Sequence, residues 1–240
     1  MIHHLRERPY LCFEFFALCI VTPAIIILNT WAALMFNFLY GAALYGFIVL
    51  ILLNTPLWTE LKGGKIRSLG RFNEIVMPWL REMWKWEAVS WANMKPILIR
   101  WVLACIAMTV FIYFYDPGRM FGLLDRAPLF IPFLMIAYPV LSALPQELVF
   151  CSFFFQRYKA FFGEGMVMVW ASAIIFAYAH ILYINPVAPT LSLFGGLIFA
   201  LTYLRTRSLA LVTIEHGLYG NYLFIVGLGY YFYGGAVVSN

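Results

Sequence analysis

The chain has 240 residues, of which 64% are hydrophobic and 11% are charged, and its mean hydropathy is +0.85. Because a soluble domain carries about 25% charged residues, this composition excludes a soluble protein and indicates a polytopic protein of the lipid bilayer. The net charge is +5, and the basic residues lie mostly in loops. No loop carries a large surface that is both basic and aromatic. We therefore expect no nucleic acid partner.

Seven apolar segments are long enough to cross a membrane, which takes about 20 helical residues. We predict an all-α fold, a polytopic membrane helix bundle with the spans 11–28, 31–53, 97–115, 129–162, 166–184, 187–204 and 208–229. Asn29 and Thr30 are expected to turn the chain between the first two spans. After the last span, the aromatic residues 230–233 are expected to form a belt at the membrane surface.

The segment 129–162 allows two interpretations, because as one straight helix it would be about 50 Å long. Pro139 and Pro145 can kink a single crossing, or they can divide the segment into two crossings and give eight spans. A single crossing places four basic residues in the cytoplasm: Arg157, Lys159, Arg205 and Arg207. We favour seven spans, because basic loops face the cytoplasm.

The spans divide the chain into a two-span hairpin (1–53), a polar amphipathic loop (54–95) and a membrane core (96–240). Basic residues place the N-terminus and the loop in the cytoplasm. Within the loop, helical spacing links Trp79, Met83, Trp86 and Ser90. This pattern indicates an amphipathic helix in the membrane interface, and a lid that gates the substrate is the alternative.

Three polar positions lie inside apolar spans of the membrane core: Glu147, His180 and the pair Glu215–His216. An ionised carboxylate in hydrocarbon costs about 2.5–3.5 kcal/mol or more, so such a residue faces a partner or a cavity. We predict that the three positions form one site, and the alternative is that each residue only joins helices. Two other charged residues, Glu14 and Arg100, are expected near the membrane surface.

A carboxylate and two imidazoles in a dry cavity can perform general acid–base catalysis. Glu147 with a histidine can deprotonate a water, and a further histidine or the amide of Asn221 can donate to a developing oxyanion. This is the chemistry of a peptide hydrolase without a nucleophilic side chain. We expect no cofactor, because no HExxH helix supports a metal. A zinc ion bound by Glu147, His180 and His216 is the weaker alternative.

Three short motifs follow one another in the membrane core. They are Gln-Glu-Leu-Val-Phe-Cys at 146–151, Phe176 with His180, and His216 followed by Asn221. In order and spacing they resemble the motifs Glu-Glu-x-x-x-Arg, Phe-x-x-x-His and His-x-x-x-Asn of the CAAX prenyl endopeptidase and bacteriocin-processing family, also called Abi or CPBP. These are multi-span intramembrane proteases, and the resemblance covers about residues 125–233.

The resemblance implies a glutamate-dependent protease in which a glutamate and His180 activate water, while His216 and Asn221 stabilise the oxyanion. Gln146 stands in place of the family's first glutamate, and Cys151 stands in place of its arginine. Asn221 comes one residue late, because Gly220 occupies the usual asparagine position. We expect Glu147 to take over the role of the missing glutamate.

We expect three residues to contact the substrate: Gln146, Phe150 and Phe176. The predicted protein is an integral endopeptidase of a bacterial inner membrane that cleaves a peptide or a membrane-anchored protein. The losses in the first motif leave an alternative from another class. This is a catalytically inactive member of the family that acts as a membrane binding or immunity protein.

Overall fold

A computed structural model describes residues 5, 7–29, 34–63 and 69–232, and these residues form helices and turns without a strand. Seven helices are long and apolar enough to span a membrane: Arg8–Leu28, Met35–Asn54, Trp91–Tyr115, Phe130–Arg157, Met166–Tyr183, Val187–Thr206 and Leu209–Val226. The predicted all-α bundle of seven spans is therefore confirmed. The turn at Thr30 and the aromatic residue Tyr233 lie outside the described residues.

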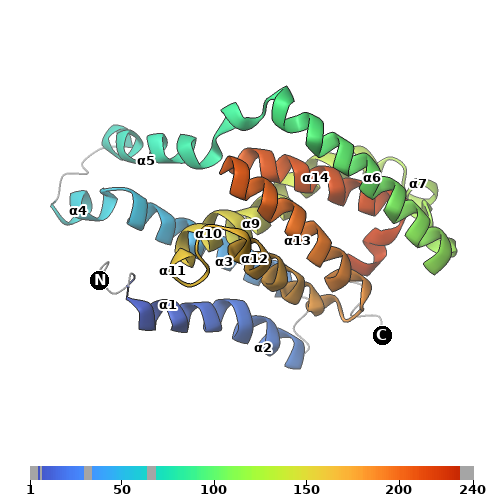
Figure 1. Cartoon of the computed structure of the whole chain (residues 1–240), viewed down its shortest axis with the longest axis horizontal. Coiled ribbons are helices and arrows are strands. Elements are labelled where there is room, and N and C mark those ends of the chain that lie inside the picture. The colour runs from blue at the N-terminus through green and yellow to red at the C-terminus, as the bar shows by residue number, and fades with distance from the viewer. Residues whose placement is uncertain (1–4, 6, 30–33, 64–68, 233–240) are drawn as a thin grey trace.

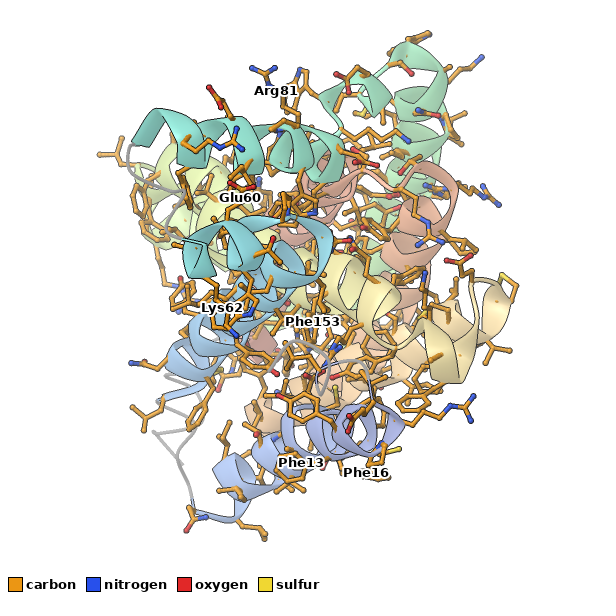
Figure 2. The ribbon with its side chains drawn as sticks, turned by 90° about the vertical axis from the view of Figure 1, so that its left-hand side faces the viewer. Phe13, Phe16, Glu60, Lys62, Arg81 and Phe153 are labelled. Carbon is orange, nitrogen blue, oxygen red and sulfur yellow. The ribbon has the colours of Figure 1, made fainter. Side chains whose placement is uncertain are left out.

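The first two spans run along one side of the molecule. The first consists of α1 (Arg8–Phe15), the wide π-helical segment η2 (Phe16–Val21) and α2 (Thr22–Leu28), and the second is α3 (Met35–Asn54). Figure 1 shows α1 and α2 along its lower edge. Figure 2 shows Phe13 and Phe16 on this first span. Both residues are more than half exposed, as is expected of a lipid-facing surface.

The polar loop forms helices that pack on the bundle. They are α4 (Leu57–Lys62), α5 (Leu69–Trp84) and the short 3₁₀ turn η4 (Trp86–Ala88). The predicted helical pattern holds only as far as Trp84, because Lys85 adopts a left-handed conformation with φ 46° and ends α5. Trp79 and Met83 are buried, and the ring of Trp79 lies 5.8 Å from that of Phe47. These two side chains therefore face the protein, whereas Arg81 points outward in Figure 2.

The third span, α6 (Trp91–Tyr115), begins six residues earlier than predicted and continues through Pro96. It lies along the upper edge of Figure 1. The short helices η5 (Pro117–Arg119) and α7 (Gly122–Arg126) then lead to the fourth span. That span is one kinked crossing, as predicted, made of α8 (Phe130–Tyr138), η6 (Pro139–Ala143), α9 (Leu144–Glu147), η7 (Leu148–Phe153) and α10 (Phe154–Arg157). Its two π-helical segments, η6 and η7, flank the Gln146–Glu147 pair.

The last three spans enclose the polar residues of the core. After α11 (Lys159–Phe162) they are α12 (Met166–Ala179) with η8 (His180–Tyr183), α13 (Val187–Thr206) and α14 (Leu209–Val226). The hydroxyl of Ser208 accepts from the amide of Leu211 at 3.1 Å and begins α14. Gly227 ends α14 with φ 109°, a conformation that suits glycine. Because α14 contacts α6, α8, α9 and α13, most of its surface is buried.

Two charged residues that were expected near the membrane surface form ion pairs within the protein. Glu14 is 3% exposed and accepts from Arg157 Nε at 2.6 Å and from Arg157 Nη2 at 2.8 Å. Arg157 is buried and also donates to the backbone oxygen of Leu5, and its predicted position on the cytoplasmic side stays a prediction. Arg100 reaches inward from α6 and donates to Glu215 at 2.8 Å.

The aromatic end of the chain contacts the rest of the bundle. The segment η9 (Leu228–Phe232) turns back against the bundle, and Tyr231 donates to Asp116 at 2.7 Å. The ring of Phe232 lies 5.9 Å from that of His180. The described part of this segment therefore packs next to His180, while Tyr230 is exposed, and the aromatic belt at the membrane surface stays a prediction.

Candidate active site

Gln146 and Glu147 are neighbours in the chain but point in different directions, because successive residues of a helix are about 100° apart. Gln146 lines a cavity inside the bundle, and Glu147 is not among the side chains that line it. Glu147 is 1% exposed and its carboxylate turns toward α14. The first motif therefore presents an amide to the cavity and a carboxylate to a neighbouring helix.

Glu147 is paired directly with a histidine. Its Oε1 lies 2.7 Å from Nδ1 of His216, which is buried on α14. Since a carboxylate oxygen accepts, Nδ1 carries the proton of this hydrogen bond. The ring of Phe199 stacks on the imidazole at 4.4 Å and an interplanar angle of 16°. The carboxylate and the aromatic ring thus fix the orientation of His216.

The other nitrogen of His216 meets a tyrosine hydroxyl. Nε2 lies 3.0 Å from the hydroxyl oxygen of Tyr138, at the end of α8. Both side chains line the cavity. Glu147, His216 and Tyr138 therefore form a hydrogen-bonded chain that runs from the helix packing to the cavity wall.

His180 lies at the start of η8, where the last turn of the fifth span tightens. Its Nδ1 is 2.7 Å from the backbone oxygen of Phe176, one helical turn earlier. Because a carbonyl oxygen accepts, Nδ1 is the protonated nitrogen, and in the neutral ring Nε2 keeps a lone pair. The Phe176 ring packs 4.5 Å from the His180 imidazole and 5.8 Å from that of His216. Phe176 therefore separates the two histidines along one side of the cavity.

The cavity has a volume of about 840 Å³ and is mostly apolar. Its polar lining includes Tyr138, Ser142, Gln146, His180 and His216, together with further hydroxyl-bearing residues such as Ser192 and Tyr219. A smaller cavity of about 130 Å³, lined by the first two spans, shares Gln146 and His180 with it. The predicted substrate contacts divide between the two, since Phe176 lines the larger cavity and Phe150 lines the smaller one.

Gln146 is anchored by one end of its amide. Its Nε2 donates to the backbone oxygen of Ser142 at 3.1 Å and to the hydroxyl of Ser142 at 2.9 Å. Its Oε1 accepts no hydrogen bond from the described residues. This oxygen is itself buried, with almost no surface exposed to the cavity.

Two expectations about individual residues differ from the geometry. Glu147 was expected to share a water with His180, yet its carboxylate is bonded to His216. Asn221 was expected at the oxyanion site, yet its Nδ2 donates to the backbone oxygen of Met135 at 3.1 Å. Asn221 is buried and does not line the cavity, whereas Gly220 does. The one-residue shift in the third motif thus turns the asparagine away.

The three residues considered for zinc do not form a metal-binding group. Within the described ranges, no cluster of three or more histidine, cysteine, aspartate or glutamate side chains could hold a metal ion. His216 uses one nitrogen for Glu147 and the other for Tyr138. We therefore derive no step through a metal.

Sequence reasoning missed Tyr138 and misplaced Glu215. Glu215 precedes His216 in the chain, but it belongs to a separate network in which Arg100 also donates to Thr202 at 3.0 Å. Tyr138 carries no polar pattern that distinguishes it from the other tyrosines of the chain. The only trace in the sequence is Gly220, which removes a side chain where the two helices meet.

The fold and the site define an integral membrane protein in which polar side chains from three spans meet at a cavity within the bundle. The model of a family described as Type II CAAX prenyl endopeptidase Rce1-like matches residues 128–221. This match confirms the resemblance and includes every polar residue described above at the cavity. Over these residues, the chain is therefore similar to a family of CAAX-protease-like intramembrane endopeptidases. No curated protein and no solved structure matched the chain.

Proposed function

We propose that the protein is an intramembrane endopeptidase that hydrolyses peptide bonds of a peptide or membrane-anchored substrate and depends on Glu147. The observation that carries the proposal is the 2.7 Å contact between Glu147 and His216, which presents the far side of the imidazole to a cavity. The family match supports the class of reaction. Basic residues near the N-terminus favour a cytoplasmic N-terminus, and we propose a bacterial inner membrane as the location.

In this proposal His180 is the general base. Its Nε2 carries the free lone pair of the neutral ring, and Gln146 lines the same cavity, where a rotation of its side chain would bring the unpartnered Oε1 to the wall as a second acceptor. A water that donates one hydrogen to each group would be held in a defined orientation. The amide of Gln146 only orients the water, because it cannot take up a proton at neutral pH.

Glu147 acts through His216. A carboxylate buried to this degree requires a compensating charge, and His216 is its ion-pair partner among the described residues. When the ring carries both protons, it places a positive charge at the cavity wall, where an oxyanion would develop. Charge stabilisation of this kind contributes about 10²–10³ in rate for one hydrogen-bond donor.

The proposed reaction is a single hydrolysis without a covalent intermediate. The oxygen of the water forms a bond to the carbonyl carbon as His180 Nε2 takes its proton. The tetrahedral intermediate then collapses, the carbon–nitrogen bond breaks, and His180 returns the proton to the leaving amine. The products are a carboxyl group and an amine, so no further reactant is needed.

The test uses the purified full chain and an internally quenched CAAX-type peptide, in farnesylated and unmodified forms. We expect the wild type to cleave at least one form, and we expect Glu147→Gln and His180→Ala to lower kcat by about 100-fold or more. Ser152→Ala is the matched control, because it removes a buried hydrogen bond (3.0 Å to Tyr203) from the same span away from the cavity. Unchanged cleavage in both site variants would refute the proposal.

One observation favours a second candidate function. The residue that faces the cavity beside His180 is an amide, Gln146, where the family places a carboxylate. A catalytically inactive membrane binding or immunity protein would retain the cavity without the chemistry. This candidate predicts that the wild type cleaves neither peptide and that a bound peptide or a protective phenotype survives Glu147→Gln.

A further inference from the structure

The hydroxyl of Tyr138 occupies the position between His216 and the cavity. It lies 3.0 Å from Nε2 of His216, and both residues line the cavity. The Tyr138 ring is held by edge contacts to His216 and Phe224, with centroid distances of 5.9 Å and 5.4 Å. A polar group is thus fixed where the imidazole would otherwise meet a substrate.

Two glycines of α14 make this position possible. A Cβ at Gly220 would overlap the ring and hydroxyl of Tyr138, and a Cβ at Gly217 would lie 2.9 Å from Cγ of Pro139. The kinked fourth span can therefore approach α14 closely only because both positions lack a side chain. The contact from Asn221 to Met135 lies one turn along the same interface.

The hydrogen-bond directions decide what Tyr138 can donate. If His216 carries both ring protons, its Nδ1–H donates to Glu147 and its Nε2–H donates to the oxygen of Tyr138. The O–H of Tyr138 is then free to point into the cavity. A phenol that accepts from a cationic donor becomes a stronger donor itself, because hydrogen bonds in a chain polarise one another.

We propose that Tyr138 is a catalytic residue that donates its hydroxyl hydrogen to the developing oxyanion. The inference rests on the proposed hydrolysis and assigns the direct donor in it. One helical turn beyond His216, the chain has no side chain at Gly220 and turns Asn221 away, so α14 supplies no amide donor there. The donor comes instead from the neighbouring span, and His216 supplies the charge behind it.

The experiment compares Tyr138→Phe with the wild type on the internally quenched peptide that the wild type cleaves. The variant keeps the aromatic ring that packs against Gly220 and removes only the hydroxyl. We expect kcat to fall by about 10²–10³ while KM stays within about twofold. We also expect a phosphonate analogue of the same peptide, which carries a tetrahedral oxyanion, to lose affinity by a similar factor. Affinity for the peptide itself should not change.

Tyr222→Phe is the control. Tyr222 also lies on α14 but does not line the cavity, and the variant removes a hydroxyl that is hydrogen-bonded to Thr109 at 2.6 Å. We expect its kcat to match that of the wild type. A Tyr138→Phe enzyme with wild-type kcat would overturn the role of Tyr138 and leave the hydrolysis standing. Equal losses of affinity for the peptide and the phosphonate would overturn it as well, since they indicate a packing defect. A wild type that cleaves neither peptide and binds the phosphonate no tighter than the peptide overturns both proposals.

Discussion

The buried ion pair between Glu14 and Arg157 gives a prediction about stability. The pair joins the first span to the end of the fourth, and both side chains are 3% exposed. Glu14 also accepts from the hydroxyls of Tyr45 at 2.6 Å and Tyr158 at 3.2 Å. Replacing Glu14 with leucine would leave the guanidinium and two hydroxyls without this acceptor in a buried position.

Breaking a buried pair by removing one partner costs about 3–5 kcal/mol, because the remaining charge is uncompensated. For a chain of this size, we expect Glu14→Leu and Arg157→Met each to lower the Tm by on the order of 10 °C, measured by thermal unfolding in detergent. The double variant Glu14→Leu/Arg157→Met should be more stable than either single variant, because it leaves no unpaired charge. Single variants that unfold at the wild-type temperature, or a double variant whose loss equals the sum of both, would refute this reasoning.

Two further predictions concern the cavity. In Gly220→Ala the new Cβ displaces the Tyr138 ring, so we expect a loss of stability of about 1–3 kcal/mol and a fall in kcat similar to that of Tyr138→Phe. Gly41→Ala is the matched control, since a Cβ at Gly41 meets nothing within 4 Å, and a Gly220→Ala enzyme that equals it in kcat and Tm contradicts the proposed contact. Gln146→Glu places a carboxylate at the cavity wall beside His180, where a second base can contribute, so we expect kcat to rise by about tenfold or more. A fall in kcat for Gln146→Glu would contradict the expected contribution of a second base at this position.

The number of spans could be predicted because the bilayer sets a length and a composition that each helix must meet. The ends of the helices were less predictable. Hydropathy favoured a start at residue 97 for the third span, but the helix begins at Trp91 and includes Lys95 and Pro96 in its first turns. The helix predicted from Trp79 to Ser90 ends early, because Lys85 adopts a left-handed backbone conformation. No residue type in that stretch indicates such a break.

The grouping of polar residues was predictable from the cost of burying them, but their partners were not. The sequence places Glu147, His180 and His216 in three late spans. The rotation of each helix about its axis cannot be derived from the sequence. That rotation pairs Glu147 with His216 and places Gln146 at the cavity that His180 also lines. Glu14 and Arg157 are 143 positions apart, so only the packing of the bundle reveals that they form a pair.

The most direct test of the account is a double-mutant cycle on kcat for Glu147 and His216, with the peptide that the wild type cleaves. If Glu147 acts only through His216, the two residues form one unit and their losses do not add. We predict that Glu147→Gln/His216→Ala is no slower than the slower of Glu147→Gln and His216→Ala. A double variant whose loss equals the product of the two single losses would contradict the account, because Glu147 would then act on the reaction independently of His216.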